Sequence, residues 1–470
     1  MNADDLVRLL WRLPLWSPVT AAARFLGRSN RPDPLPPIPG PAPLDEFVKN
    51  AGEEFLAGAA TRDITPENPD GILLGGFDFN RPCAGVRDPI YARALVLSDG
   101  KTPLVIVTLD LVGLSQVRTN RIRDRLTREH SVSILLVCTH NHQSPDTLGL
   151  WGPALFGLLP YQTGLDAGYM TWLEEQIVEC VKSATKQARP VRLHLASGEF
   201  DKKDRWIHNE RSPVRDRGLR VVHLADKGGT AIATLIQHAC HPETLWKSNR
   251  LISADFCGAC CNHVENKIGG VALYANGALG AMVTAALDWE TPFRQRAEFL
   301  EGLGETLGAA AVRLVKRAKI VEDPSIQITR SEVHLPAKDN RLFSLVQALG
   351  VVESRDLENE LVSEVSFVRL GPASITTLPG EAAPVLGLEI LARVPGSPKL
   401  LFCLANDELG YLLPPEFFFD RAYAYESTMG PGPQSATRLA LAVEAVASRA
   451  SRDGGIRVRN PDTPSLSPKS

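Results

Sequence analysis

Several features that would mark a specialised protein are scarce or missing in this sequence of 470 residues. No run of 18 or more apolar residues occurs, so the sequence predicts no ordinary membrane-spanning helix. Charges of the two signs nearly balance, since the sequence has 51 Lys and Arg residues and 54 Asp and Glu residues, for a formal net charge of −3. A nucleic-acid-binding surface needs clustered Lys and Arg, and we therefore expect no nucleic-acid partner.

Cysteine is also scarce. Eight cysteines are too few for a disulfide scaffold in a chain of this length, and several lie in apolar, strand-like runs where cysteine acts as a small hydrophobic residue. This usage slightly favours a reducing compartment. What is present is an ordinary globular composition, 44% hydrophobic and 22% charged, which is enough for a sizeable core.

The first 30 residues form an apolar, aromatic segment that Arg8, Arg12, Pro14 and Pro18 interrupt. A secretory signal needs an uninterrupted apolar core after its charged start, and this segment lacks one. Two interpretations remain open: an interfacial amphipathic element that makes peripheral membrane contact, or an extra helix docked on the domain or on a partner. The lack of a clean signal slightly favours a cytoplasmic or peripheral-membrane location.

Composition also predicts the domain boundaries. Residues 31–44 contain RPDPLPPIPGPAP, and this density of proline predicts an extended, polyproline-like linker. Residues 45–455 form the main domain. Residues 456–470 are polar and rich in proline and serine, which predicts a disordered tail.

Strand-like and helix-like patterns alternate along the main domain. Short apolar or β-branched runs predict strands at residues 103–109, 131–137, 191–196, 231–237, 271–275, 365–370, 373–378 and 400–404. Amphipathic runs predict helices at residues 115–128, 166–187, 295–317, 382–392 and 435–450. Strands separated by helices of this length predict an α/β fold, a single large domain of stacked mixed β-sheets flanked by helices.

The segment CTHNHQSPDT, residues 138–147, places His140 and His142 two residues apart directly after an apolar run. If the strand continues this far, residues i and i+2 face the same cleft. Neutral imidazole is a common zinc donor, and a catalytic zinc typically takes three protein ligands plus water. Taken alone, however, the pair favours hydrogen-bonded polar structure over a metal site, because buried polar groups usually find ordinary partners.

Two further residues follow predicted strands. His241 precedes Pro242, which holds it extended at a strand end, and strand ends are a usual place for ligands in α/β proteins. Glu381 follows a Leu-Pro-Gly break and opens the predicted helix at 382–392. Each also has an ordinary interpretation, as a capping or core histidine for His241 and as stabilisation of a helix N-terminus for Glu381.

Two other groups of residues invite functional interpretations. Cys257, Cys260, Cys261 and His263 suggest a second metal site, but a structural zinc needs a second ligand pair at suitable spacing, so ordinary cysteines at the start of a helix are favoured. Two aromatic, apolar stretches either line an acyl-chain channel or pack as ordinary loops. They consist of Trp151, Phe156, Leu158, Leu159 and Tyr161 after the histidine pair, and of Phe417, Phe418 and Phe419 near Tyr411.

An ordered set of segments runs from Gly58 to Ala450. They are GAATRDITP (58–66), GGF (75–77), RDPIYARALVLSDG (87–100), CTHNHQSPDT (138–147), HNERSP (208–213), ACHPETL (239–245), ISADF (252–256), YANGALG (274–280), LPGE (378–381), NDELGYLLPPE (406–416) and YEST (425–428). No single segment is decisive, but in this order they resemble the catalytic domain of the neutral/alkaline non-lysosomal ceramidase family.

This resemblance implies one zinc ion per chain, with ligands at His140, His241, Glu381 and Tyr411. It also implies that His142, Arg211 and Tyr425 line the reacting group. His142 would shuttle a proton to the leaving amine, whereas Arg211 and Tyr425 would donate hydrogen bonds to the tetrahedral oxyanion. The implied activity is hydrolysis of a linear amide by zinc-activated water, with an N-acyl lipid such as ceramide as the substrate. Family members are often exported or membrane-associated, which opposes the location inferred from the N-terminal segment.

The chain departs from the family pattern in two places. After YANGALG the family has an Asp-x-Ser-Pro-like stretch with a proposed nucleophilic serine, whereas this chain has Ala281 at the Asp position and Val283 at the serine position. Thr284 would replace the serine only if the register slipped by one residue. Direct attack by zinc-activated water is therefore favoured over acyl-serine chemistry. The chain also ends after the helix at 435–450, without the C-terminal β-sandwich domain of the family.

Three hypotheses of function remain open. Retention of the implied metal ligands favours a ceramidase-like zinc amidohydrolase. The altered stretch at Ala281 and Val283 favours a degenerate homologue that binds an acyl lipid or a partner protein without turnover. The third hypothesis keeps the metal chemistry but directs it at an ester, a lactone or a secondary-metabolite amide.

Overall fold

The computed structural model describes residues 44, 47, 54–127, 132–155, 157, 159–284, 287–288, 290–336, 341–353 and 360–453. The predicted N-terminal segment, all but the last residue of the linker, and the predicted tail lie outside the described residues, so their boundaries stay predictions. Phe156 and Leu158 also lie outside them. Within the described part, no helix is both long enough and apolar enough to cross a membrane.

Two β-sheets form the centre of the molecule. The larger sheet has the strand order β13-β11-β10-β8-β1-β3-β4-β5, with β15 paired to β8, and the smaller has the order β16-β17-β18-β20. The strands of the larger sheet are β1 (Leu56–Asp63), β3 (Tyr91–Ser98), β4 (Pro103–Leu109), β5 (Ser133–Cys138), β8 (Arg189–Glu199), β10 (Gly218–Asp226), β11 (Ala231–His238), β13 (Val271–Asn276) and β15 (Lys319–Val321). Those of the smaller sheet are β16 (Ile326–Pro336), β17 (Glu360–Leu370), β18 (Ala373–Thr377) and β20 (Lys399–Phe402).

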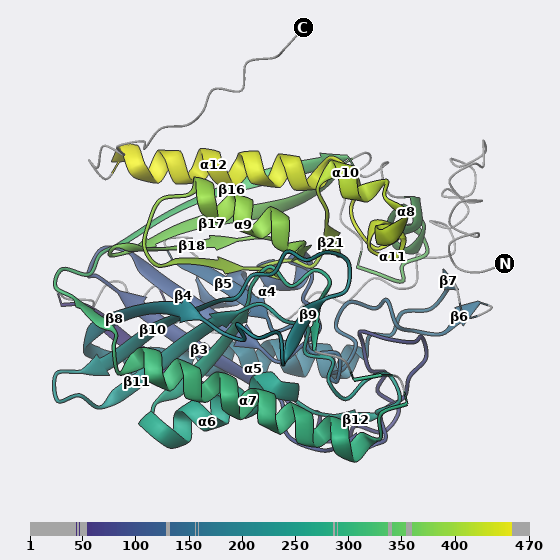
Figure 1. Cartoon of the computed structure of the whole chain (residues 1–470), viewed down its shortest axis with the longest axis horizontal. Helices are drawn as coiled ribbons and strands as arrows, with labels where there is room; N and C mark the ends of the chain where they lie inside the picture. Colours follow the sequence, from purple (N-terminus) through teal and green to yellow (C-terminus); the bar gives the residue numbers. More distant parts are fainter. Residues whose placement is uncertain are drawn as a thin grey trace, which may run out of the picture.

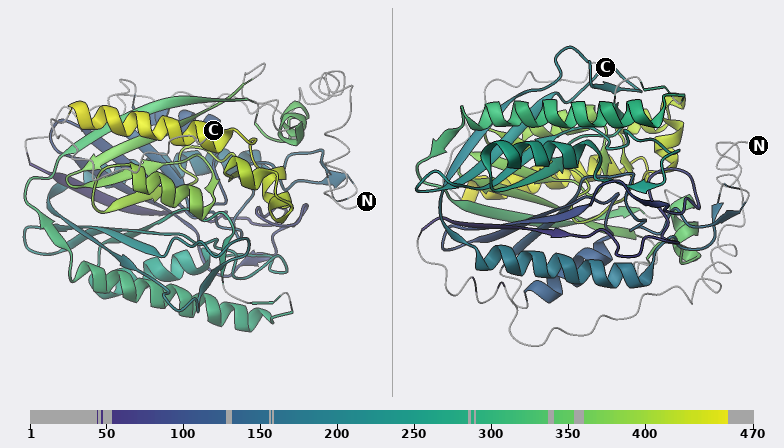
Figure 2. Two further views of the ribbon diagram at one scale, coloured as in Figure 1. Left: turned by 45° about the horizontal axis from the view of Figure 1, so that its top comes forward. Right: turned by 90° about the horizontal axis from the view of Figure 1, so that it is seen from below.

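Helices cover the outer faces of the two stacked sheets (Figure 1). Above the smaller sheet lie α9 (Pro384–Arg393) and α12 (Ser435–Asp453). The other face of the molecule carries α5 (Ala167–Lys186), α6 (Asp255–Ile268) and α7 (Phe293–Val315). Helices α6 and α7 lie side by side, whereas α5 lies apart from them and packs on β1 and β3 of the larger sheet (Figure 2). The remaining described helices are α4 (Gln116–Leu126), α8 (Arg341–Ala348), α10 (Pro415–Phe418), a 3-10 turn (Arg421–Tyr423) and α11 (Ala424–Thr428). The predicted α/β fold of stacked mixed sheets between helices is confirmed.

Strand β4 shows why this arrangement suits the sequence. Every residue of PLVIVTL is buried, because both faces of the strand are covered. Leu104 and Ile106 belong to the apolar cluster between the two sheets, whereas Val105, Val107 and Leu109 belong to the cluster that includes α5. Successive side chains of a strand point to opposite faces, so a continuous apolar run is what a strand buried on both sides requires.

Within the residues that the structure describes, four short strand pairs lie outside the two main sheets. They are β2 (Gly85–Val86) with β12 (Leu251–Ile252), β6 (Ala154–Leu155) with β7 (Leu159–Pro160), β9 (Ile207–Asn209) with β14 (Met282–Thr284), and β19 (Glu381–Ala382) with β21 (Tyr411–Leu412). The last pair matters most, because it sets Glu381 directly beside Tyr411 in parallel register. Two implied metal ligands that lie thirty residues apart in sequence are thereby neighbours.

All the predicted strands and helices are found, with ends displaced by a few residues. One local prediction is wrong: Glu381 does not open a helix, because it lies in β19 and α9 begins only at Pro384. Strands β1, β3, β10 and β16 were not among the predicted elements. In β16 exposed and half-buried residues outnumber buried ones, so its apolar pattern is weak.

Candidate metal centre

His140 is held in place by a left-handed backbone turn. Strand β5 ends at Cys138, and His140 has a φ of 67°, so the strand does not continue to His142 and strand alternation does not place the two histidines. Its Nδ1 lies 2.7 Å from the carbonyl oxygen of Val112, which follows β4. A carbonyl can only accept, so Nδ1 carries the proton and Nε2 is left with its lone pair.

His241 follows the end of β11 and is anchored twice to one carbonyl. The oxygen of Met282 accepts hydrogen bonds from the backbone N–H of His241 at 2.8 Å and from its Nδ1 at 3.0 Å. The side chain is buried, with an exposed residue fraction of 2%. As in His140, the proton on Nδ1 directs Nε2 into the site.

The carboxylate of Glu381 lies between the Nε2 atoms of the two histidines. Its Oε2 is 2.9 Å from Nε2 of His241 and 3.3 Å from Nε2 of His140. Three donor atoms from three separate segments of the chain therefore converge, and a backbone carbonyl holds the Nδ1 of each of the two histidine rings. Two imidazoles and a carboxylate with such supporting hydrogen bonds are a donor set that suits a catalytic zinc ion, so these residues fit a metal.

Electrostatics support this interpretation of the three residues. Burial disfavours a charged His241, but the hydrogen bond and negative charge of Glu381 outweigh it and raise the pKa of His241 to about 9. The same two histidines hold the pKa of Glu381 well below its usual range, against the effect of burial. The arrangement thus attracts positive charge at the point where the three donors meet.

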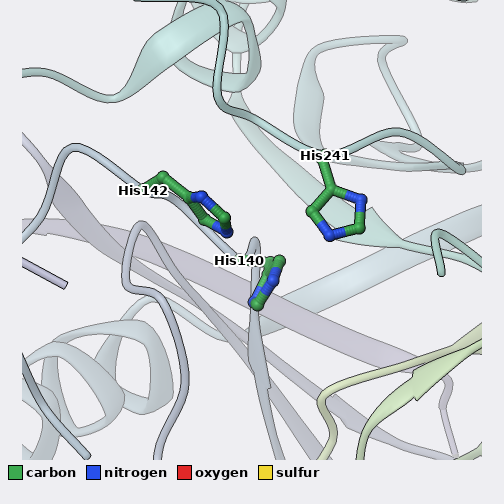
Figure 3. A group of neighbouring side chains, drawn as sticks. All are labelled: His140, His142 and His241. Carbon is green, nitrogen blue, oxygen red and sulfur yellow. The ribbon is translucent and has the colours of Figure 1, made fainter. Parts of the chain in front are cut away.

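His142 stands beside this group without an anchor of the same kind. Its ring centroid is 4.7 Å from that of His140 and 5.6 Å from that of His241 (Figure 3). Ligand nitrogens of these three histidines lie within 4.8 Å of one another, so the three could also hold a metal ion together. Neither ring nitrogen of His142 has a hydrogen-bond partner among the described residues. Burial, followed by the neighbouring His140 and His241, lowers the pKa of His142 well below its usual value and keeps the ring neutral.

The other predicted residues surround the same point. The ring of Tyr411 is stacked 6.4 Å from that of His241, and the ring of Tyr425 lies 6.0 Å from that of Tyr411. Arg211 donates from Nε to the Glu426 carboxylate at 2.6 Å, next in sequence to Tyr425. Burial and the charge of Glu381 raise the pKa of Tyr411 well above its usual value. The predicted site residues come from six segments that are distant in the sequence, and the fold brings these segments close together.

Asn276, at the end of β13, is a residue whose role the sequence did not reveal. Its Oδ1 accepts a hydrogen bond from the N–H of Cys240 at 3.0 Å, and its Nδ2 donates to the carbonyls of Thr139 and Cys240, each at 2.8 Å. Its own carbonyl accepts from the N–H of Cys403 at 3.0 Å. One buried amide thus fixes the segments that carry His140 and His241. In the sequence, Asn276 is a polar residue at the end of an apolar strand and part of YANGALG, and neither feature shows which segments it joins.

Arg81 fixes the backbone at His142. Its guanidinium donates to the carbonyls of His142 at 2.6 Å and Gly75 at 2.7 Å. Gly76 has a φ of 94°, and a Cβ placed there would lie 2.4 Å from Cγ of His142. Gly76 of the GGF segment is therefore a glycine because the ring of His142 occupies the space that a side chain would need.

Features outside the site have ordinary structures. Cys257, Cys260 and Cys261 are buried on α6, which confirms the predicted helix start, and burial raises the pKa of each thiol. Val283 lies in β14, opposite His208 in β9. All eight cysteines are free.

Comparison with known proteins agrees with the geometry. The family model "Neutral/alkaline non-lysosomal ceramidase, N-terminal" matches residues 55–288. A neutral ceramidase from Pseudomonas aeruginosa has a similar structure, with a TM-score of 0.70 and 18% identity, over 89% of this chain and 77% of that chain. A ceramidase complexed with C2 matches with a TM-score of 0.70 and 17% identity, over 89% of this chain and 78% of that chain. At such identities the two structures establish the fold, while the family model, together with the ordered motifs, establishes the relationship. The chain belongs to the neutral/alkaline non-lysosomal ceramidase family.

Proposed function

We propose that this protein is a zinc-dependent hydrolase that cleaves the linear amide bond of an N-acyl lipid such as ceramide. One observation carries the proposal: Oε2 of Glu381 lies within 3.3 Å of Nε2 in both His140 and His241, and carbonyls fix the opposite nitrogens. These three residues would hold the ion, with Tyr411 beside them as a further oxygen donor.

A bound zinc ion would supply a Lewis acid and would lower the pKa of a water molecule to about 7. His142 is neutral and buried, so it can accept a proton from the attacking water and deliver it to the leaving amine nitrogen. Arg211 and the phenol of Tyr425 can donate hydrogen bonds to the oxyanion that forms when the amide carbon becomes tetrahedral.

The nature of the nucleophile follows from what stands after YANGALG. Ala281 and Val283 offer neither a carboxylate nor a hydroxyl, so an acyl-serine intermediate has no serine at this position. Thr284 is the next residue of β14, and its side chain lies on the opposite face from that of Val283. Attack by water is therefore the route that these residues support.

An N-acyl lipid is favoured as the substrate because the chain belongs to a ceramidase family and shares its fold with a ceramidase complexed with C2. The same two residues, Ala281 and Val283, favour a second candidate, a homologue that binds an acyl lipid without turnover. The two candidates differ in metal content and in hydrolysis, and both quantities can be measured.

The first test is metal analysis of the purified full-length protein. We expect one zinc ion per chain, lost in His140→Ala and in His241→Ala. His334→Ala is the matched control, because this exposed histidine pairs with Glu360 far from the site in sequence. Zinc that is substoichiometric in the wild type, or that both site variants retain, would refute the metal site.

The second test is hydrolysis by zinc-loaded protein. A short-chain fluorescent ceramide is compared with N-acyl amino acids and with simple esters. Preferential release of the fatty acid from ceramide supports the proposal. Full zinc occupancy without cleavage of any of these substrates supports the binding homologue, and cleavage of the esters alone moves the chemistry to another substrate class.

A further inference from the structure

Neighbouring residues fix the position of the His142 ring, but no hydrogen bond among the described residues determines which of its two nitrogens carries the proton. The ring contacts Phe77 edge-on at a centroid distance of 4.8 Å, and the backbone carbonyl of His142 accepts from Arg81. His140 and His241 each have Nδ1 on a carbonyl, whereas both nitrogens of His142 lack a hydrogen-bond partner among the described residues. A proton carrier with a free choice of tautomer would present the wrong nitrogen part of the time.

Glu243 is the carboxylate that faces Nδ1 of this ring. Its Oε2 lies 3.8 Å from Nδ1 of His142, and the two side chains are 12% and 9% exposed. At 3.8 Å the two atoms are too far apart for a formed hydrogen bond, and a small rotation of the glutamate side chain would bring them within its range.

The backbone fixes the two residues relative to each other. The N–H of His142 donates to the carbonyl of Pro242 at 3.1 Å, so the segment that carries Glu243 is bonded directly to residue 142. The N–H of Glu243 donates to the carbonyl of His241 at 3.1 Å, and the N–H of Trp246 donates to the carbonyl of Glu243 at 2.9 Å. These bonds make a tight turn, and the approach of Glu243 to His142 is therefore a property of the fold.

We propose that Glu243 is a positioning residue that holds the Nδ1–H tautomer of His142. The assignment rests on the proposed function, in which His142 carries a proton. With Nδ1–H directed at Glu243, the lone pair of Nε2 is available on the far side of the ring, which points towards His140 and His241 in Figure 3.

The role has a defined place in the reaction. Nε2 takes one proton from the attacking water as the C–O bond forms, and returns it to the amide nitrogen as the C–N bond breaks. The proton on Nδ1 stays in place throughout, and the carboxylate of Glu243 stabilises the imidazolium between the two transfers. A carboxylate behind a catalytic histidine sets the tautomer and orientation in this way in other hydrolases.

The test compares Glu243→Leu, Glu243→Gln and the control Glu210→Gln in the full-length, zinc-loaded protein. Glutamine keeps a carbonyl acceptor at the same length, whereas leucine removes it. Glu210 is an exposed neighbour whose charge acts on Glu243, so its variant controls for the loss of one nearby negative charge. We expect Glu243→Leu to lower kcat by about 10- to 100-fold at unchanged KM and zinc content. Glu243→Gln should recover most of the loss, and Glu210→Gln should match the wild type.

A second readout does not depend on activity. The ¹⁵N chemical shifts of histidine-labelled, metal-free protein report which nitrogen of His142 is protonated, with His142→Asn to assign the signal. We expect Nδ1–H in the wild type and in Glu243→Gln, and a mixture of tautomers in Glu243→Leu.

Two results would overturn the assignment. One is a Glu243→Leu variant with the tautomer and kcat of the wild type; the other is loss of zinc in both Glu243 variants, which would make this residue a ligand. If the wild type neither binds zinc nor hydrolyses an amide, the proposed function fails, and the tautomer measurement still decides whether Glu243 pairs with His142.

Discussion

Replacing Gly76 by alanine should move His142 without touching any metal donor. Gly76 has a φ of 94°, and the added Cβ would lie 2.4 Å from Cγ and 2.8 Å from Cδ2 of His142. Carbon atoms in contact lie about 3.5 Å apart, so the ring has to shift by about 1 Å. A displacement of about 1 Å in a group that takes part in the chemistry can lower the rate about 100-fold.

The assay measures kcat and KM on a short-chain fluorescent amide together with zinc content. Gly71→Ala is the matched control, because Gly71 has a similar φ of 85° but no atom within 4 Å of its added Cβ. Both variants should lose about 1 kcal/mol of stability from a left-handed alanine. Only Gly76→Ala should lose kcat, and it should keep its zinc.

Two outcomes would refute this reasoning. Undiminished kcat in Gly76→Ala, with a folded protein, would show that the position of His142 does not matter for turnover. Loss of zinc in Gly76→Ala but not in Gly71→Ala would make His142 a metal ligand, as the close grouping of the three histidines also permits. The same experiment therefore separates a proton carrier from a third imidazole donor.

Two further predictions concern stability. Burial and the neighbouring His194 lower the pKa of His223 to about 4, so below pH 6.5 the unfolded chain takes up a proton that the folded state refuses. Between pH 7 and pH 5 the wild type should lose about 2 kcal/mol more unfolding free energy in urea than His223→Gln, and equal losses would contradict the shift. Arg123 donates to both oxygens of the buried Glu364 at 2.7 and 3.0 Å, so Arg123→Leu should cost about 3–5 kcal/mol. The double variant Arg123→Leu/Glu364→Leu should regain most of this unfolding free energy in the same assay. If it is no more stable than Arg123→Leu, the loss does not come from the carboxylate left without its arginine.

The central strands were predictable because burial on both faces leaves an unbroken apolar run. Residues 103–109 and 231–237 are such runs, and they match β4 and β11 within a residue. The edge strand β16 has one face partly open to solvent and carries Thr, Arg, Ser and Glu, so no apolar run marks it. What identifies β16 as a strand is its full pairing with β17, a contact between distant segments that a local pattern does not contain.

The residue types at strand ends predicted which side chains come together in the site, whereas strand alternation did not predict their geometry. Strand alternation would bring His140 and His142 to one side only if the strand continued to them, and β5 instead ends at Cys138, with His140 in left-handed geometry. The rings meet because this turn, not strand alternation, directs both towards His241. The type of residue at a strand end therefore indicated which side chains the fold brings together, and their role as metal ligands stays a prediction. The backbone path between them depends on Val112 and Gly76, whose roles no periodicity reveals.

Positioning residues differ from ligands in how they can be detected. A ligand must be a histidine, a carboxylate or a similar donor, so its chemistry is visible in one sequence. Asn276 acts by joining residues 139 and 240, which lie 137 and 36 positions away, and any buried amide of suitable length could do so. Glu243, the proposed positioning residue, approaches Nδ1 of His142 because the N–H of His142 donates to the carbonyl of Pro242. The sequence thus shows which donor residues stand at strand ends. The geometry of those donors depends on contacts between distant segments, which form only in the folded chain.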